Sequence, residues 1–225
     1  TGYSTTKSAV IAKDISSTSA VQLKEQNASL AGMNVITEPI VSYTSGNLAS
    51  HVLGYVGPID EQEYETRKDT YRNDDIIGKS GIQYVFEKYL KGTDGVKQVD
   101  MTVDGAITSE YISEEAVSGS DVVLTIDANL QKVAEEALKE NIENIAAGKY
   151  GEKHDTKAGA VVVMNVHTGE VLAMASYPDY NPERYSEEYS NDDTGKYTNR
   201  AISGAYPPGS TFKMAVATAA LQEGA

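Results

Sequence analysis

The sequence predicts an α+β fold with mainly antiparallel sheets, on the basis of three observations. Apolar residues recur with a helical period over residues 81–92. Two alternating segments flank a turn dipeptide over residues 96–112. A strand, a long amphipathic helix and a second hairpin follow one another over residues 121–176. We therefore expect two groups of elements, one before and one after a boundary at residues 118–120.

The first part of the chain predicts short and irregular elements. Residues 20–26 and 48–53 each favour a short helix. Residues 34–43 are rich in β-branched side chains, which favour a strand, but Pro39 lacks the N–H that a sheet ladder requires. This segment is therefore expected to be an edge or irregular strand.

Residues 81–92 predict one amphipathic helix bracketed by glycines. Its apolar stripe consists of Ile82, Val85, Phe86, Tyr89 and Leu90. Residues 96–103 and 106–112 then alternate around Asp104-Gly105, a dipeptide that accommodates the positive φ angles of a tight turn. These two segments predict a β-hairpin.

The second group begins after the serine and glycine of residues 118–120. Residues 121–126 predict a strand, Asp127 is a candidate N-cap, and residues 130–145 have helical periodicity. Residues 159–176 predict a hairpin through a His-Thr-Gly turn.

Two further stretches of this second group have distinctive compositions. Residues 159–164 form a run of six apolar or small residues, which is typical of a strand that is covered on both faces. Residues 177–206 form a polar stretch rich in Tyr, Asn, Asp and Glu, which is long for a plain connection.

Composition excludes several classes of function. The 225 residues carry 19 basic and 33 acidic side chains, a net charge of −14, so binding to nucleic acid is disfavoured. The absence of cysteine excludes disulfides, thiolate nucleophiles and cysteine-based zinc sites. His51, His154 and His167 share no ligand spacing, so each is expected to be a turn or surface residue. We expect no metal and no cofactor.

The chemistry is expected near the end of the chain, where Pro207, Pro208 and Gly209 precede Ser210. These residues prevent an earlier helix start, so the helix is expected to begin close to Ser210 and to run to about residue 221. Lys213 then lies one turn from Ser210 on the same face. A serine hydroxyl becomes a nucleophile when a base takes its proton, and lysine can be that base where desolvation or nearby cations favour its neutral form.

This motif resembles the active-serine motif of the penicillin-recognising transpeptidases, and the resemblance extends upstream. Five further segments look like class B penicillin-binding proteins, in the same order. They are residues 51–57, 77–82, 90–95, 124–131 and 168–178. Together with the active serine, they cover the chain from about residue 34 to its end.

The resemblance implies two domains and two catalytic residues. Residues 1–117 would form an irregular pedestal, or dimerisation, domain with a helix and a β-hairpin. Residues 118–225 would form the first part of an α/β transpeptidase domain with a mainly antiparallel sheet, cut after the active-serine helix. Ser210 would be the nucleophile and Lys213 its general base in D,D-transpeptidation through an acyl-serine intermediate.

The family also implies partners and a location. The expected ligands are peptidoglycan stem peptides ending in D-Ala-D-Ala and β-lactams, while the pedestal would bind glycan-polymerising and other cell-wall or division proteins. A homodimer is possible. The protein is expected on the outer face of the bacterial cytoplasmic membrane, held by an N-terminal transmembrane helix outside this chain.

The 225-residue chain alone is expected to be inactive, because the family's Ser-x-Asn and Lys-Thr-Gly motifs would lie beyond residue 225. Phe212, Val216 and Ala219 or Ala220 would then lie on an uncovered helix face. Two alternatives remain: a scaffold module that binds cell-wall synthesis proteins, and a β-lactam receptor or β-lactamase that shares Ser-x-x-Lys. The pedestal-like first half disfavours the latter.

Overall fold

The computed structural model describes residues 10–26, 29–30, 33–38, 40–102, 107–185 and 192–224. The chain divides into two compact units, and each unit is built from two separate stretches of sequence. The first unit comprises Thr1–Val41 and Gly92–Gly119. The second comprises Ser42–Lys91 and Ser120–Ala225. Short antiparallel sheets and helices confirm the predicted α+β class.

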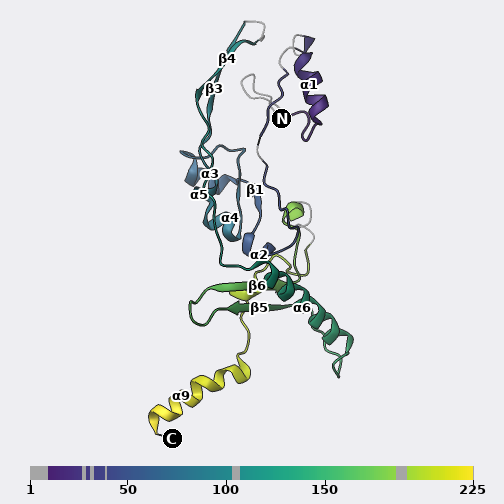
Figure 1. Ribbon diagram of the computed structural model, residues 1–225, viewed down its shortest axis with the longest axis vertical. Helices are drawn as coiled ribbons and strands as arrows, with labels where there is room; N and C mark the ends of the chain where they lie inside the picture. Colours follow the sequence, from purple (N-terminus) through teal and green to yellow (C-terminus); the bar gives the residue numbers. More distant parts are fainter. Residues whose placement is uncertain are drawn as a thin grey trace. The chain divides into compact units, whose positions relative to one another are not determined.

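The first unit contains a helix and a long hairpin (Figure 1). Helix α1 spans Ser17–Glu25, and the Ser16 hydroxyl caps it by accepting a hydrogen bond from the Ser19 N–H. Strands β3 (Val96–Met101) and β4 (Ile107–Glu114) pair antiparallel, which confirms the predicted hairpin, although its Asp-Gly turn lies outside the described residues.

The strand predicted over residues 34–43 is wrong for the part of it that the structure describes. Its last residue, Tyr43, contacts two side chains instead. The Tyr43 N–H donates to the Glu183 carboxylate (3.1 Å), and the Tyr43 hydroxyl accepts from Gln83. Burial raises the pKa of Tyr43 to about 12.

The second unit contains a small sheet that the sequence pattern did not reveal. Strand β1 (Val56–Pro58) pairs antiparallel with β2 (Ile76–Gly78), and α3 (Glu61–Arg67) lies between them in the chain. A capping box starts α3, because the side chains of Asp60 and Glu63 each accept a hydrogen bond from the other's backbone N–H. The adjoining core consists of Ile59, Tyr71 and Ile77, with Tyr64 packed against it.

The single helix predicted over residues 81–92 is two short helices, α4 (Gly81–Val85) and α5 (Glu87–Leu90). They meet at Phe86, whose φ of −103° and ψ of 12° depart from helical values. The break allows α4 to pack against the backbone of β2 while the Glu87 carboxylate accepts a hydrogen bond from the Gly78 N–H (2.8 Å).

The long helix α6 (Ala128–Ala147) lies against the hairpin of β5 (Gly159–Met164) and β6 (Val171–Tyr177), as Figure 1 shows. The Asp127 carboxylate caps α6, as predicted, by accepting the N–H groups of Asn129 and Leu130 (2.9 Å each). The close contact is possible because small side chains form its core. They are Ala134, Ala173 and Ala175.

Two expectations for this region are wrong. Strand β5 is not covered on both faces in the described structure, since α6 covers one face and leaves Val162 and Met164 half exposed (45% and 52%). Residues 121–126 form no strand. They run past β6 with isolated contacts instead, in which the Thr125 hydroxyl donates to the Val171 carbonyl and the Asp127 N–H to that of Leu172.

Backbone contact at Gly54 yields a testable prediction. Both Gly46 (φ 62°) and Gly54 (φ 81°) have left-handed backbones, but only a Cβ at Gly54 would overlap the Ser80 carbonyl. Gly46→Ala should lower the free energy of unfolding by about 1–2 kcal/mol from backbone strain alone. Gly54→Ala should cost at least about 2 kcal/mol more, because the overlap is added. Urea denaturation of both variants measures the difference, and equal losses would contradict the close approach.

Candidate active site

Ser210 lies in a 3₁₀ turn, η4 (Gly209–Phe212), that leads directly into α9 (Lys213–Glu223). The helical path therefore begins close to Ser210, as predicted, although the α-helix proper begins at Lys213. The Lys213 N–H donates to the Ser210 carbonyl across this junction. Gly209 precedes the serine with a φ of 54°, a value that favours glycine. The Ser210 N–H thus lies at a helix start, where N–H groups lack helical partners.

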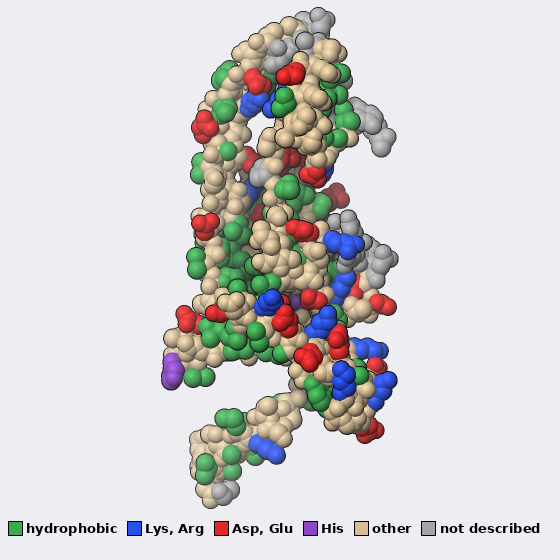
Figure 2. Space-filling model, turned by 45° about the vertical axis from the view of Figure 1, so that its right-hand side comes forward, with side chains coloured by type: hydrophobic (Ala, Val, Ile, Leu, Met, Phe, Trp, Pro, Cys, Tyr) green, Lys and Arg blue, Asp and Glu red, His purple; other side chains and the backbone are tan. Residues whose placement is uncertain are grey.

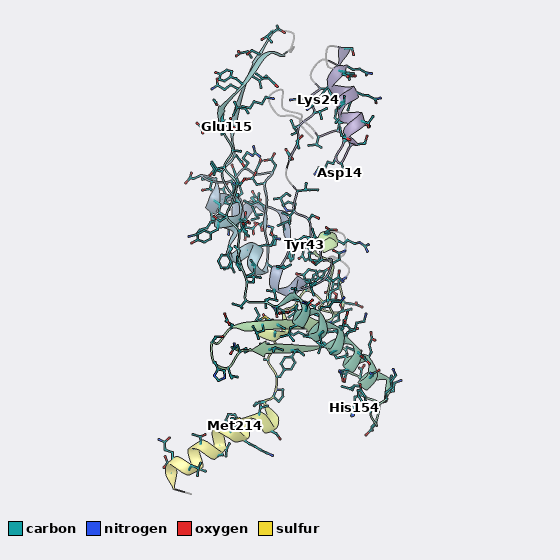
Figure 3. The ribbon with its side chains drawn as sticks, in the orientation of Figure 1. Asp14, Lys24, Tyr43, Glu115, His154 and Met214 are labelled. Atoms are coloured by element: carbon teal, nitrogen blue, oxygen red, sulfur yellow. The ribbon has the colours of Figure 1, made fainter. Side chains whose placement is uncertain are left out.

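Both predicted site residues are exposed, and so is the apolar surface of α9. Ser210 and Lys213 are accessible to solvent, and the described residues show no hydrogen bond between their side chains. The apolar face expected to be uncovered is exposed in the described structure: Phe212 is 57% and Val216 55% exposed. Figure 2 shows apolar side chains along α9, and Met214, labelled in Figure 3, is 79% exposed. The catalytic roles of Ser210 and Lys213 stay predictions.

Upstream of Ser210, residues 192–200 form a loop that is closed by its own polar side chains. The Asp192 carboxylate accepts the N–H of Thr194 (2.9 Å) and that of Lys196 (3.1 Å). The Arg200 guanidinium donates to the carbonyls of Gly195 (2.9 Å) and Thr194 (3.1 Å). We refer to residues 192–200 as the clasp loop.

The clasp loop is fixed to the short helix α2 (Ser50–Leu53) by two residues. The His51 Nε2–H donates to the Lys196 carbonyl at 2.6 Å, and the Asn199 side-chain amide donates to the His51 carbonyl at 3.2 Å. The same Asn199 caps α8 (Arg200–Ser203), because its oxygen accepts the Ala201 N–H at 3.2 Å. Loop and helix are thus joined in both directions.

The expectation that all three histidines lie in turns or at the surface is correct for two of them. His154, labelled in Figure 3, and His167 are exposed. For His51 it is wrong, since this residue is buried at 8% exposure. Tyr180 contacts it edge-on, with ring centroids 5.1 Å apart, and the Tyr180 hydroxyl donates to the Ser50 carbonyl at 2.9 Å. Tyr180, which belongs to the polar stretch noted over residues 177–206, therefore packs on α2.

Helix α2 is also linked to α6 and β6 through two polar side chains. Gln131 is fully buried and pairs with the backbone of Met174 in β6. Its side-chain nitrogen donates to the Met174 carbonyl (2.8 Å), and its side-chain oxygen accepts the Met174 N–H (2.7 Å). Gln131 also donates to Glu135 (2.7 Å), and the same Glu135 oxygen accepts the Ala49 N–H (2.9 Å). Burial raises the pKa of Glu135, and these two hydrogen bonds oppose the shift.

The sequence did not predict the structural roles of Asn199, Gln131 and Glu135. One sequence feature could have indicated Gln131: it is a polar residue next to the apolar stripe of the predicted helix, and a buried amide there must find partners.

The helices in the described part of the chain include none with the length and apolar character needed to span a bilayer.

Known protein families match both parts of the chain. The penicillin-binding protein dimerisation domain matches residues 1–124, and the penicillin-binding protein transpeptidase domain matches residues 159–225. This chain belongs to the penicillin-binding proteins. The resemblance found from its motifs is thereby confirmed.

Individual relatives assign this penicillin-binding protein to the class B, PBP2-like group. The peptidoglycan D,D-transpeptidase MrdA of Acinetobacter baumannii is 32% identical over 229 residues, which cover 97% of this chain and 32% of that protein. MrdA of Escherichia coli K12 is 33% identical over 195 residues, which cover 81% and 28%. The chain thus spans about a third of the length of these relatives.

Solved structures agree in fold. A peptidoglycan synthase complex that coordinates polymerisation and crosslinking matches with a TM-score of 0.68 and 36% identity, over 81% of this chain and 33% of that one. The complex between PBP2 and MreC from Helicobacter pylori matches with a TM-score of 0.60 and 31% identity, over 80% and 32%.

The buried histidine predicts a pH dependence of stability. Burial lowers the pKa of His51 below 6.5, and the positive charge of Arg200 lowers it further. The hydrogen bond to Lys196 and the negative charge of Asp179 raise this pKa, but burial is the larger effect. Below about pH 6.5 the unfolded state therefore binds a proton before the folded state does, so the contribution of His51 is present above this pH and is lost as the pH falls. We expect the stability difference between the unmodified chain and His51→Gln, measured by urea denaturation, to shrink from pH 7.5 to pH 5.5. A constant or growing difference would contradict the burial of a neutral imidazole.

Proposed function

We propose that the chain forms the pedestal and the first part of the catalytic domain of a peptidoglycan D,D-transpeptidase, with residues 1–117 as the pedestal and 118–225 as the catalytic part. The observation that supports this most directly is the position of Ser210 and Lys213, at the η4–α9 junction and within the transpeptidase-domain match. The names of the relatives support the same reaction class.

In the proposed reaction Ser210 is the nucleophile. Its Oγ–H passes the proton to the Lys213 amine while Oγ attacks the carbonyl carbon of the penultimate D-Ala of a stem peptide. The peptide bond to the terminal D-Ala breaks, and that leaving amine takes the proton. The amine of a second stem peptide then attacks the acyl-serine ester. Its proton passes through the Lys213 amine to Ser210 Oγ as the ester C–O bond breaks, which forms the cross-link and frees Ser210. A β-lactam would follow the first step only, with ring opening in place of release of D-Ala.

The oxyanion and the base impose different demands on the protein. In the proposed attack, the Ser210 N–H donates to the oxyanion that develops, and the position of Ser210 at the start of η4 supports this role. A lysine acts as a base where desolvation or nearby cations favour its neutral form, and Lys213 is exposed to solvent in the described structure. Further protein must therefore surround Lys213 in the active enzyme, and the isolated 225-residue chain should be inactive.

The scaffold role is a second candidate that a specific observation favours. Two of the structures similar to this chain are complexes with other proteins, one of which contains MreC. The first unit also exposes apolar side chains on its hairpin, namely Val96, Val99, Tyr111 and Ile112. We propose that the pedestal binds cell-wall synthesis proteins while the protein is anchored on the outer face of the cytoplasmic membrane. A homodimer through this pedestal is part of the same proposal.

Covalent labelling of the full-length gene product by a fluorescent penicillin tests the catalytic assignment. Ser210→Ala should abolish the label, because it removes the nucleophile. Lys213→Ala should slow labelling by roughly 10²-fold or more through loss of the base. Ser203→Ala, an exposed serine of α8, is the matched control and should label normally. Normal labelling of Ser210→Ala would contradict the nucleophile.

The unmodified proteins provide the remaining comparison. The full-length protein should be acylated stoichiometrically, whereas intact mass should detect no acyl adduct on the 225-residue chain. An unlabelled full-length protein would favour the scaffold function instead, and an acylated 225-residue chain would contradict the requirement for further protein around Lys213.

A further inference from the structure

The connection between α8 and Ser210 is short and conformationally restricted. It contains Pro207 and Pro208, whose rings fix φ, and Tyr206, which the following proline biases towards an extended backbone. Gly204 ends α8, and a Cβ at this position would overlap both the Tyr206 ring and the Arg200 carbonyl. Whatever fixes the start of α8 therefore also limits the positions available to Ser210.

The start of α8 is fixed by Asn199, which makes two kinds of contact. Its side-chain oxygen accepts the N–H of Ala201 and the hydroxyl of Ser176 at the end of β6 (3.3 Å), so it caps α8 and links it to the sheet. Its side-chain nitrogen donates to the His51 carbonyl, a contact between residues 148 positions apart, and more weakly to Met174 Sδ (3.7 Å). The first contact is an ordinary helix cap. The second has no role in starting a helix.

His51 reinforces that second contact from the opposite side. Its backbone carbonyl receives Asn199, while its buried imidazole donates to Lys196 at 2.6 Å, three residues earlier in the clasp loop. The charged groups that face the imidazole are Asp179, on the chain after β6, and Arg200 of α8. A single residue of α2 thus holds both ends of the segment Lys196–Asn199.

We propose that His51 and Asn199 are positioning residues for Ser210, so that α2 sets the acylation rate of the active serine without touching the substrate. This inference rests on the proposed transpeptidase function. Displacing the clasp loop from α2 would leave η4 and α9 folded but would misplace Ser210, and a misplacement of about 1 Å can cost roughly 10²-fold in rate. Changes that reach α2 through its contact with α4 would act on the same serine.

Asn199→Asp separates the two roles of Asn199. Asp is as good an N-cap as Asn, so α8 should still form, but the donor to His51 is replaced by a carboxylate oxygen that repels the carbonyl. Asn181→Asp is the matched control, because it makes the same chemical change at a cap outside the clasp loop. Asn181 caps the 3₁₀ helix η2 (Pro182–Arg184) by accepting the Glu183 N–H (2.9 Å).

Both variants are made in the full-length gene product, and acylation by penicillin is followed by stopped flow over a range of concentrations. We expect Asn199→Asp to lower the first-order acylation rate constant by roughly tenfold to a hundredfold, with the dissociation constant of the preceding complex changed less than threefold and with cooperative thermal unfolding retained. Asn181→Asp should match the unmodified protein in both constants. A merely structural role would lower the active fraction and leave the rate constant of the remaining molecules unchanged.

A second pair of variants decides the matter if Asn199→Asp does not fold. His51→Gln keeps a side-chain donor for Lys196, whereas His51→Ala removes it, so His51→Gln should acylate at least about fivefold faster than His51→Ala. Equal rate constants in this pair, or an unchanged rate constant in folded Asn199→Asp, would overturn the positioning role. Failure of the unmodified protein to be acylated at Ser210 would instead overturn the proposed function on which it rests.

Discussion

The second unit depends on the hydrogen bonds that hold the four-residue helix α2 in place. A helix of this length has no independent stability, because one turn does not offset the cost of nucleation. Besides its own helical bonds, three of its peptide groups bind residues far away in the sequence: Glu135 binds the Ala49 N–H, Tyr180 binds the Ser50 carbonyl and Asn199 binds the His51 carbonyl. Unpaired buried backbone groups are costly, so these partners and α2 must form together.

This constraint explains why residues 42–91 belong to the same compact unit as residues 120–225 although the hairpin of the first unit separates them in the sequence. Gln131 connects α6 to β6, Glu135 connects α6 to α2, and the clasp loop connects α2 to the chain that leads to Ser210. Under the proposed function, residues 42–91 of the pedestal therefore help to hold the nucleophile Ser210 in position.

Elements stabilised by local interactions could be predicted from the sequence. The cap at Asp127 and the apolar period of α6, and the alternation of β3 and β4, are properties of neighbouring residues. The break at Phe86 and the pairing of β1 with β2 arise from contacts with other segments, so no local pattern contains them. Likewise Ser210 and Lys213 stand out as a motif, whereas His51 and Asn199 acquire their roles only because the fold brings α2 and the clasp loop together.

Native-state hydrogen exchange on the 225-residue chain tests this account most directly. The informative amides are those of Leu53 and Gly54, which bond within α2, and those of Gln131 and Met174, which belong to α6 and β6. If α2 and its partners form one cooperative unit, all four amides should exchange with the same opening free energy and the same dependence on denaturant. Exchange of Leu53 and Gly54 through a separate opening of lower free energy, with Gln131 and Met174 still protected, would contradict it.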